Sequence, residues 1–320
     1  MLQSQNQRRS DNLCMWLLLV AALLLCVACG GGDNKIYVKT GNNAREASTP
    51  AQQPQRIISL SPSTTEVLYG VGAFGRVVAV SDYDKFPPEV SRLPKVGGWS
   101  NTNLEQVAAL RPDLIVMTAS QSPLIKDKLD ALGVRTVSVP SYTVEDALLG
   151  IEQIGAATGT DEAARKLVGE TRAKLDEVRG RTRELPRLRV LCIVDRVPGT
   201  LRGLYTATRG SFIAELIETA GGESIAPPAS NGFGQISKEA VVSLNPDIIF
   251  DMLQSGEGQL AENTQEVWKE LANVKAVREG RVYLLRDESM LHPSQFVGET
   301  ARKFAGLIHP AAFGGHERAR

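Results

Sequence analysis

One short segment occurs twice in this chain, and this repetition constrains the fold more than any other feature of the sequence. The first copy reads E-Q-V-A-A-L-R-P-D-L-I-V from Glu105, and the second reads E-A-V-V-S-L-N-P-D-I-I-F from Glu239. Just before each glutamate stands Asn103 or Ser237, whose side-chain oxygen can cap the first free N–H groups of a helix. A proline ends each helix, and an apolar run typical of a buried strand follows. The sequence therefore predicts two related α/β lobes.

Strand and helix patterns around the two copies predict where these lobes lie. Residues 55–158 alternate short apolar runs with helical segments, as in a parallel sheet, and residues 187–313 contain the second copy. Residues 159–186 are rich in charge, with apolar residues at helical spacing, and predict one long, stiff connecting helix. Such a molecule suits a cleft between lobes or a partner with twofold symmetry. The expected strands are 56–60, 77–80, 114–117, 136–139, 189–194 and 282–285.

Two local motifs concern the first lobe. Ser63 and Glu66 form the S-x-x-E pattern of a capping box, which predicts a helix that begins there and runs to Tyr69. The segment from Gly70 to Gly75 matches G-x-G-x-x-G, but its glycines follow a helix and precede a strand. A dinucleotide-binding fingerprint must follow a strand and open a helix. These glycines are therefore interpreted as a helix stop and a turn.

The N-terminus has the pattern of an export signal. Arg8 and Arg9 precede an apolar run over residues 15–28, which is short for a bilayer span of about 20 residues but fits a secretory signal. A small residue precedes Cys29, so residues 1–28 resemble a lipoprotein signal peptide and Cys29 is predicted to carry the lipid. The alternative is a plain signal peptide or a short uncleaved anchor.

Segments without periodicity flank the lobes. Residues 29–54 are rich in Gly, Asn, Ala, Ser and Gln and are predicted to be a flexible tether, and residues 314–320 a disordered tail. A tether behind a lipid anchor lets the lobes reach a membrane partner without embedding in the bilayer. We therefore expect an exported protein, anchored on the periplasmic or cell-surface side.

Composition excludes several classes of function. Acidic and basic residues balance at 36 each, which argues against nucleic acid as a partner. Cys192 is the one cysteine within the lobes, and its apolar surroundings predict a small buried core residue. The three histidines, His292, His309 and His316, are too few for a closed metal site of about four ligands. His292 is interpreted as structural, with a place in the cleft wall as the alternative. No hydrolase motif is present, so we expect neither an enzyme nor a resident metal or cofactor.

Aromatic residues gather just upstream of the two repeated helices. Tyr83 and Trp99 lie in the long loop 81–100, and Phe233 precedes the second copy as Trp99 precedes the first. Loops at the carboxyl ends of strands line the ligand crevice of an α/β sheet, and flat rings there suit a large planar ligand. Packing of the rings against irregular loops is the alternative.

The two repeated glutamates form a candidate docking pair. A carboxylate in the first turn of a helix is stabilised by the helix dipole, which alone explains Glu105 and Glu239. Their equivalent positions in two lobes would also present a symmetric pair of charges to two arginine patches on a dimeric partner.

Together these motifs resemble the iron-siderophore/cobalamin group of ABC-importer substrate-binding lipoproteins, over roughly residues 55–313. The resemblance is carried by R-I-I-S-L-S-P-S from Arg56, V-G-G-W from Val96 and L-R-P-D-L-I from Leu110. It implies two Rossmann-like lobes joined by one rigid helix, with a ligand cleft between them and little closure on binding. It also implies a monomer whose two repeated glutamates dock to arginines on a permease homodimer with its ATPase subunits.

Within that group, the spacing of Tyr83, Trp99 and Glu105 is similar to that of cobalamin-binding members, whose rings flank the corrin. Phe233 stands where those members have Trp, and Ser61 and Arg202 complete the predicted ligand-binding set. A corrinoid is therefore the predicted ligand.

Two other ligand classes stay open. Haem-binding relatives tend to carry a Tyr ligand near the position of Trp99, and indole cannot ligate iron. Anionic ferric siderophores would need arginines in the cleft, which Arg196, Arg202 and Arg209 could supply.

Overall fold

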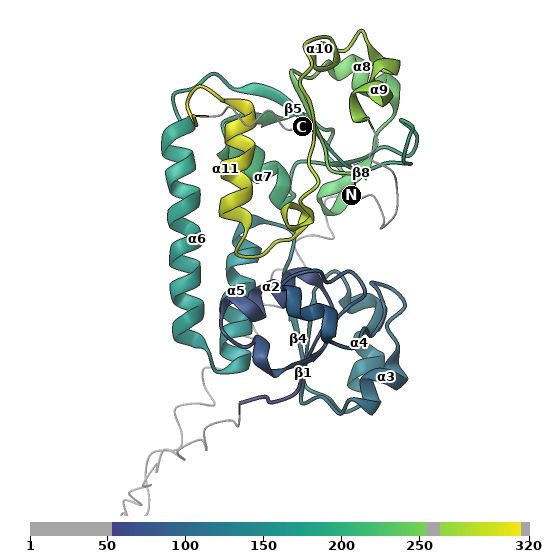
Figure 1. The fold of residues 1–320 in the computed structure, drawn as a ribbon, viewed down its shortest axis with the longest axis vertical. Coiled ribbons are helices and arrows are strands. Elements are labelled where there is room, and N and C mark those ends of the chain that lie inside the picture. Colours follow the sequence, from purple (N-terminus) through teal and green to yellow (C-terminus); the bar gives the residue numbers. More distant parts are fainter. Residues whose placement is uncertain (1–52, 254–262, 315–320) are drawn as a thin grey trace, which may run out of the picture. The chain divides into compact units, whose positions relative to one another are not determined.

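Two separate sheets, one in each half of the chain, organise the fold (Figure 1). The computed structural model describes residues 53–253 and 263–314. The predicted signal peptide, Cys29, most of the predicted tether and almost all of the predicted tail lie outside the described residues.

The N-terminal lobe has a four-stranded, fully parallel sheet in the order β2-β1-β3-β4. Its central strands β1 and β3 are completely buried, because helices cover the sheet and the strand residues are almost all apolar. The strands are β1 (Ile57–Ser59), β2 (Val77–Ala79), β3 (Leu114–Thr118) and β4 (Thr136–Val139). The helices are α2 (Pro62–Gly70), α3 (Leu104–Ala109), α4 (Ser122–Asp130) and α5 (Val144–Thr158), with short 3-10 turns at Phe74–Arg76 and Pro88–Arg92.

The C-terminal lobe repeats this plan and adds a hairpin. Strands β7-β5-β9-β10 are mutually parallel and correspond in order to β2-β1-β3-β4, whereas β6 and β8 run antiparallel. The parallel central strands predicted for the lobes are confirmed, and in this lobe the antiparallel strands β6 and β8 extend the sheet because the chain reverses after β5. The strands are β5 (Leu188–Asp195), β6 (Tyr205–Ala207), β7 (Gly222–Ser224), β8 (Phe233–Gln235), β9 (Ile248–Asp251) and β10 (Val282–Leu284). The helices are α7 (Phe212–Thr219), α8 (Lys238–Leu244), α9 (Thr264–Trp268), α10 (Lys275–Arg278) and α11 (Val297–Ile308), with 3-10 turns at Ser230–Gly232, Lys269–Leu271 and Glu288–Leu291.

The two copies of the repeat fold alike. Asn103 and Ser237 cap α3 and α8 by accepting a backbone N–H three residues on, as predicted. Both helices end just before a proline, as predicted. The residue directly before each proline, Arg111 or Asn245, adopts a positive φ, of 46° or 43°. The two copies thus share backbone conformation even at positions where their residue types differ.

The aspartate after each proline ties the repeat to the first strand of its lobe. The Asp113 N–H donates to the Arg56 carbonyl at 3.0 Å, and the Asp247 N–H to the Arg189 carbonyl at 2.9 Å. Each carboxylate in turn accepts the backbone N–H of the same partner, at 2.9 and 2.8 Å. Both aspartates therefore set the register of β3 on β1 and of β9 on β5.

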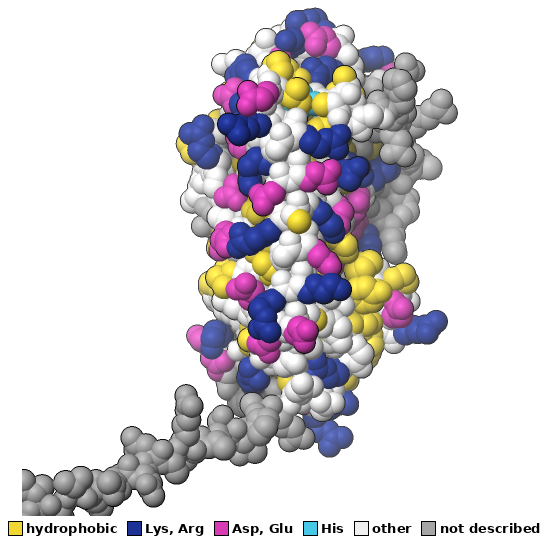
Figure 2. All heavy atoms as spheres, turned by 90° about the vertical axis from the view of Figure 1, so that its left-hand side faces the viewer, with side chains coloured by type: hydrophobic (Ala, Val, Ile, Leu, Met, Phe, Trp, Pro, Cys, Tyr) yellow, Lys and Arg dark blue, Asp and Glu magenta, His cyan; other side chains and the backbone are white. Residues whose placement is uncertain are grey.

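Helix α6 (Asp161–Thr182), within the predicted connecting segment 159–186, joins the lobes through both of their cores. Ala164 and Val168 are buried in the N-terminal core, and Leu175 and Val178 in the C-terminal core. The exposed face around α6 carries interspersed acidic and basic side chains, as Figure 2 shows. One amphipathic helix thus stiffens the junction by packing with each lobe.

Two local predictions on helices differ from the structure. Helix α5 was not predicted from the sequence, although Thr143 and Asp146 form a reciprocal capping box at its start and Gly159 ends it with a φ of 69°. The predicted capping box of Ser63 and Glu66 is wrong, because α2 begins at Pro62 and the Glu66 side chain is buried elsewhere. The glycines that follow α2 lead through a turn into β2, as predicted.

Candidate functional site

Two exposed rings stand on the loop that follows β2. Tyr83 is 58% exposed and Trp99 is 41% exposed. A Cβ at Gly98 would lie 3.0 Å from the Tyr83 ring, so the glycine lets this ring lie against the backbone beside Trp99. The loop leaves the carboxyl end of a parallel strand, which is the crevice side of an α/β sheet. The two residues singled out by sequence are therefore available to a ligand.

A buried acid holds this loop. Asp84 accepts hydrogen bonds from the backbone N–H of Ser81, at 3.0 Å, and from its hydroxyl, while Lys95 donates to the Asp84 carbonyl at 2.9 Å. Burial raises the pKa of the Asp84 carboxyl, although hydrogen bonds from Ser81 and Thr65 and the charge of Lys95 oppose the rise. The loop under Tyr83 is thus fixed by internal polar contacts.

The hairpin of the C-terminal lobe contributes other candidates. Phe233 lies on β8 and is half-buried against the C-terminal core, and Arg202 is exposed. Tyr205 on β6 is 39% exposed, and no feature of the sequence marked it as a candidate. Its three-residue strand has the pattern exposed, buried, buried, so no alternation in the sequence could have marked it.

Of the three arginines considered for an anionic ligand, Arg196 is held in a buried ion pair and Arg209 lies at a different cavity. The Arg196 Nε lies 2.9 Å from Asp251 Oδ2, with both side chains fully buried, and the Trp268 indole N–H donates to the same oxygen at 2.8 Å. Arg196 is therefore not available to a siderophore, which corrects that expectation. Arg209 lines a cavity of about 440 Å³ with Arg179 and Glu215, and none of the predicted ligand-binding residues lines that cavity.

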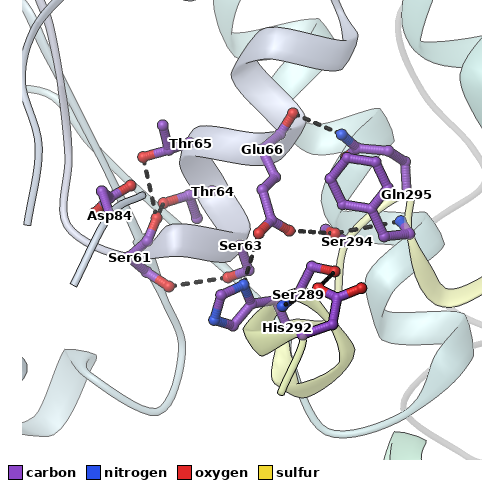
Figure 3. Close-up of polar contacts among 12 residues, drawn as sticks. Ser61, Ser63, Thr64, Thr65, Glu66, Asp84, Ser289, His292, Ser294 and Gln295 are labelled. Carbon is purple, nitrogen blue, oxygen red and sulfur yellow. Dashed lines mark hydrogen bonds and ion pairs between the residues drawn. The ribbon is translucent and has the colours of Figure 1, made fainter. Parts of the chain in front are cut away.

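A polar network links the lobes beside the start of α2 (Figure 3). Glu66 is 2% exposed, and its carboxylate contacts His292 Nδ1 at 2.6 Å and accepts the Ser294 hydroxyl at 2.5 Å. Gln295 donates to the Glu66 carbonyl at 2.8 Å. Ser61, which is 5% exposed, pairs its hydroxyl with that of Ser63 at 2.9 Å in the same region.

The segment 286–296 that carries this network is a second connection between the lobes. It leaves β10 of the C-terminal sheet and crosses to α2 of the N-terminal lobe before α11 begins. Glu288 pairs with Lys85 at 2.6 Å, and the Phe296 ring meets the Phe86 ring edge-on at 5.3 Å. Helix α6 is therefore not the sole element that sets the angle between the lobes.

Glu105 and Glu239 occupy the second position of α3 and α8, and both are exposed. Hydrogen bonds from its own backbone N–H and from Ser237 lower the pKa of the Glu239 carboxyl. Neither glutamate forms an ion pair with any residue that the structure describes. Both lobes thus present an unpaired negative charge at the same point of the repeat.

Metal and thiol chemistry have little support in the part of the chain that the structure describes. No group of three or more His, Cys, Asp or Glu side chains is placed to hold a metal ion within residues 53–253 and 263–314. Cys192 is 1% exposed, as predicted, and burial raises the pKa of its thiol. No helix among these residues is long and apolar enough to cross a membrane.

Two α/β lobes joined by a long helix, with exposed rings at the carboxyl edge of a sheet, define a solute-binding protein of the two-lobed type. Residues 57–289 match the family described as periplasmic binding protein, and the chain belongs to this family. Its members are exported, bind small ligands and act with a membrane permease and ATPase. The chain is therefore the substrate-binding component of an ABC transporter.

Similar proteins agree with this assignment and are transport proteins rather than enzymes. An uncharacterized ABC transporter substrate-binding lipoprotein of Bacillus subtilis is 27% identical over 316 residues, covering 93% of this chain and 98% of the relative. A vitamin B12-binding protein of Yersinia pestis is 30% identical over 223 residues, covering 68% and 76%.

Solved structures share the fold. A periplasmic vitamin B12-binding protein of Vibrio cholerae superposes with a TM-score of 0.69 at 24% identity, covering 81% of this chain and 98% of that one. A periplasmic heme-binding protein of Roseiflexus gives 0.70 at 22% identity, covering 81% and 99%. The same two-lobed architecture therefore occurs in proteins named for different ligands.

Proposed function

We propose that this protein captures a cobalamin-type corrinoid between its lobes and delivers it, chemically unchanged, to a dimeric ABC permease. The observation that carries the proposal is the pair of exposed rings, Tyr83 and Trp99, on the one loop that follows β2. Exposed aromatic surface is unfavourable in water and gains free energy when a flat ligand covers it. Tyr205 and Phe233 on the opposite hairpin offer rings of the second lobe. The name of the Yersinia relative supports the same ligand.

Docking would use the repeated glutamates. Glu105 and Glu239 lie at equivalent points of two lobes, exposed and without ion-pair partners among the described residues. A permease homodimer would offer the same arginine patch to each of them, because its two subunits are identical. Charged pairs across such an interface set the orientation of docking as well as the affinity. A lipid on Cys29 would hold the protein close to this partner.

A ferric siderophore or haem is the second candidate ligand. Arg202 is exposed on the C-terminal lobe and would suit an anionic siderophore. Trp99 offers no ligand to haem iron. The corrinoid is favoured because Tyr83 and Trp99 are exposed on the crevice loop, whereas Lys85 and Lys95 of the same loop contact Glu288 and the Asp84 carbonyl.

The test is retention of ligand by the purified protein. After incubation with cyanocobalamin, haemin or a ferric siderophore and desalting, we expect corrinoid absorbance to remain. Trp99→Ala should weaken binding about tenfold or more, the effect of removing a buried aromatic anchor. Leu149→Ala is the control, since this apolar side chain is 42% exposed on α5, outside the loop that carries Trp99. Retention of an iron chelate alone would favour the second candidate, and retention of nothing would refute a ligand crevice.

Docking is tested separately by charge reversal. Glu105→Arg with Glu239→Arg should abolish uptake into cells while the affinity for the ligand stays unchanged, because neither residue lies on the crevice loops. Glu223→Arg, at an exposed acid outside the repeat, is the matched control. Normal uptake by the double variant would contradict glutamate docking.

A further inference from the structure

His292 lies where the crevice sides of the two sheets come together. The segment that carries it leaves the carboxyl end of β10 in one lobe. Helix α2, which it contacts through Glu66, begins directly after the carboxyl end of β1 in the other lobe. Since ligands of open α/β sheets bind outside the carboxyl ends of the strands, the imidazole stands at the floor of the proposed crevice.

The orientation of this ring is set by a buried acceptor. His292 Nδ1 lies 2.6 Å from Glu66 Oε1, and the other carboxylate oxygen accepts the Ser294 hydroxyl at 2.5 Å. Gln295 holds the Glu66 backbone carbonyl at 2.8 Å. No Lys or Arg pairs with Glu66 among the described residues. The Glu66 carboxylate, which is 2% exposed, is thus oriented by Ser294 and can accept a hydrogen bond from His292 Nδ1.

The second ring nitrogen faces away from this network. Nε2 has no hydrogen bond to any described residue, and the His292 side chain is 18% exposed. Figure 3 shows this nitrogen directed away from Glu66 and Ser63. With the proton on Nδ1, the neutral imidazole carries its lone pair on Nε2, on the open side of the ring.

An imidazole held through one nitrogen by a carboxylate is the arrangement found around metal-ligating histidines. The carboxylate fixes the tautomer and raises the basicity of the free nitrogen. We propose that His292 supplies Nε2 as an axial ligand to the metal of the captured ligand. This rests on the proposed function and adds one requirement to it: the metal of the captured ligand must have an exchangeable axial position.

The chemical step is ligand exchange without electron transfer. The Nε2 lone pair forms a bond to the metal, the bond to an axial water breaks, and that water leaves to solvent. The metal keeps its oxidation state. Binding is therefore reversible, as delivery to a permease requires.

Absorbance spectra test this inference with the whole protein. We expect aquocobalamin and haemin to shift their visible bands on binding, because imidazole nitrogen replaces water at the metal. Cyanocobalamin, in which both axial positions are occupied, should bind without a shift. In His292→Ala the shift should disappear, and added imidazole should restore it. Glu66→Gln should weaken aquocobalamin binding about 10- to 100-fold, the usual effect of losing a partner of a metal-bound histidine.

The outcomes separate the two proposals. If aquocobalamin and haemin are retained with unshifted bands, or if His292→Ala shows the same shift, His292 is not a ligand and the proposed function stands. If imidazole fails to restore the shift in a folded His292→Ala protein, the inference is also refuted. If no tetrapyrrole is retained at all, the proposed function fails and the inference fails with it.

Discussion

The two lobes contain the same repeated helix and strand, but they bury different kinds of side chain at the end of that strand. The pairing of Ile57 with Leu114 and of Val190 with Ile248 makes Met117 of β3 the counterpart of Asp251 of β9. Both side chains are completely buried. The N-terminal lobe thus places a thioether where the C-terminal lobe places a carboxylate.

This difference teaches that an inserted loop can change the chemistry of a repeated core. Arg196 lies at the start of the connection between β5 and β6, which has no counterpart in the N-terminal lobe. Its ion pair with Asp251, completed by Trp268, fastens that connection to the sheet. The hairpin that presents Tyr205 is positioned by this buried cluster.

The largest expected effect comes from the same substitution at the two equivalent positions. Asp251→Leu should lower the free energy of unfolding by about 3–5 kcal/mol, because it removes the carboxylate from a buried ion pair and leaves the Trp268 indole N–H without its acceptor. Met117→Leu should cost less than about 1.5 kcal/mol, because it conserves volume in an apolar site. Denaturant unfolding of both variants measures the contrast.

A triple variant then sharpens the comparison. Arg196→Met and Trp268→Phe, added to Asp251→Leu, give the C-terminal lobe the apolar solution of the N-terminal lobe. Stability should return to within about 2 kcal/mol of the natural protein, since apolar replacements of buried pairs are often neutral. A triple variant as unstable as Asp251→Leu would show that the cluster has a packing role beyond charge pairing.

A smaller effect is expected where α6 meets each lobe. A Cβ at Gly155 of α5 would lie 2.3 Å from the Ala164 Cβ, and one at Gly298 of α11 would lie 2.8 Å from the Lys174 Cβ. Gly155→Ala should therefore cost about 1–3 kcal/mol through overpacking, and Gly298→Ala less. Gly169→Ala, at an open position on α6, should stabilise by about 0.5–1 kcal/mol. Thermal unfolding ranks the three, and a reversed order would contradict close packing at the N-terminal end.

The smallest expected effect is a pH dependence of stability that has opposite signs for one aspartate in each lobe. Burial raises the pKa of Asp84, so its contribution to stability is full in acid and is lost as pH rises through the folded-state value. Burial opposes ionisation of Asp247 too, but hydrogen bonds from Lys275 and the Arg189 N–H outweigh it and lower the pKa. The stability from Asp247 is therefore present above about pH 4 and lost as pH falls below it.

Unfolding free energies measured between about pH 2.5 and 7 check these signs. The difference in unfolding free energy between natural protein and variant should rise with pH for Asp247→Asn and fall with pH for Asp84→Asn. Parallel pH profiles for the two variants would contradict the assignment.

Predictions from sequence succeeded where a pattern acts locally. The helix caps at Asn103 and Ser237, the stop before each proline and the buried strands after it depend on neighbouring residues alone. The S-x-x-E pattern of Ser63 and Glu66 did not form a capping box, because the Glu66 carboxylate contacts His292 instead of the backbone at the start of its own helix. His292 is 226 residues away in the sequence, so no local pattern could have shown this. Helix α5 had a readable capping box at Thr143 that was overlooked.

Periodicity, caps and turn residues specify elements through short-range physics, so they sufficed to predict the two-lobed α/β plan, the connecting helix and the exposed positions of Tyr83, Trp99, Glu105 and Glu239. The burial of Arg196, the exposure of Tyr205 and the contact of Glu66 with His292 became known from the folded chain alone. These facts depend on which distant groups meet out of water. A buried charged side chain needs a partner, and that partner usually comes from a distant part of the sequence. No local pattern therefore predicts whether such a side chain is paired inside the protein or accessible to a ligand.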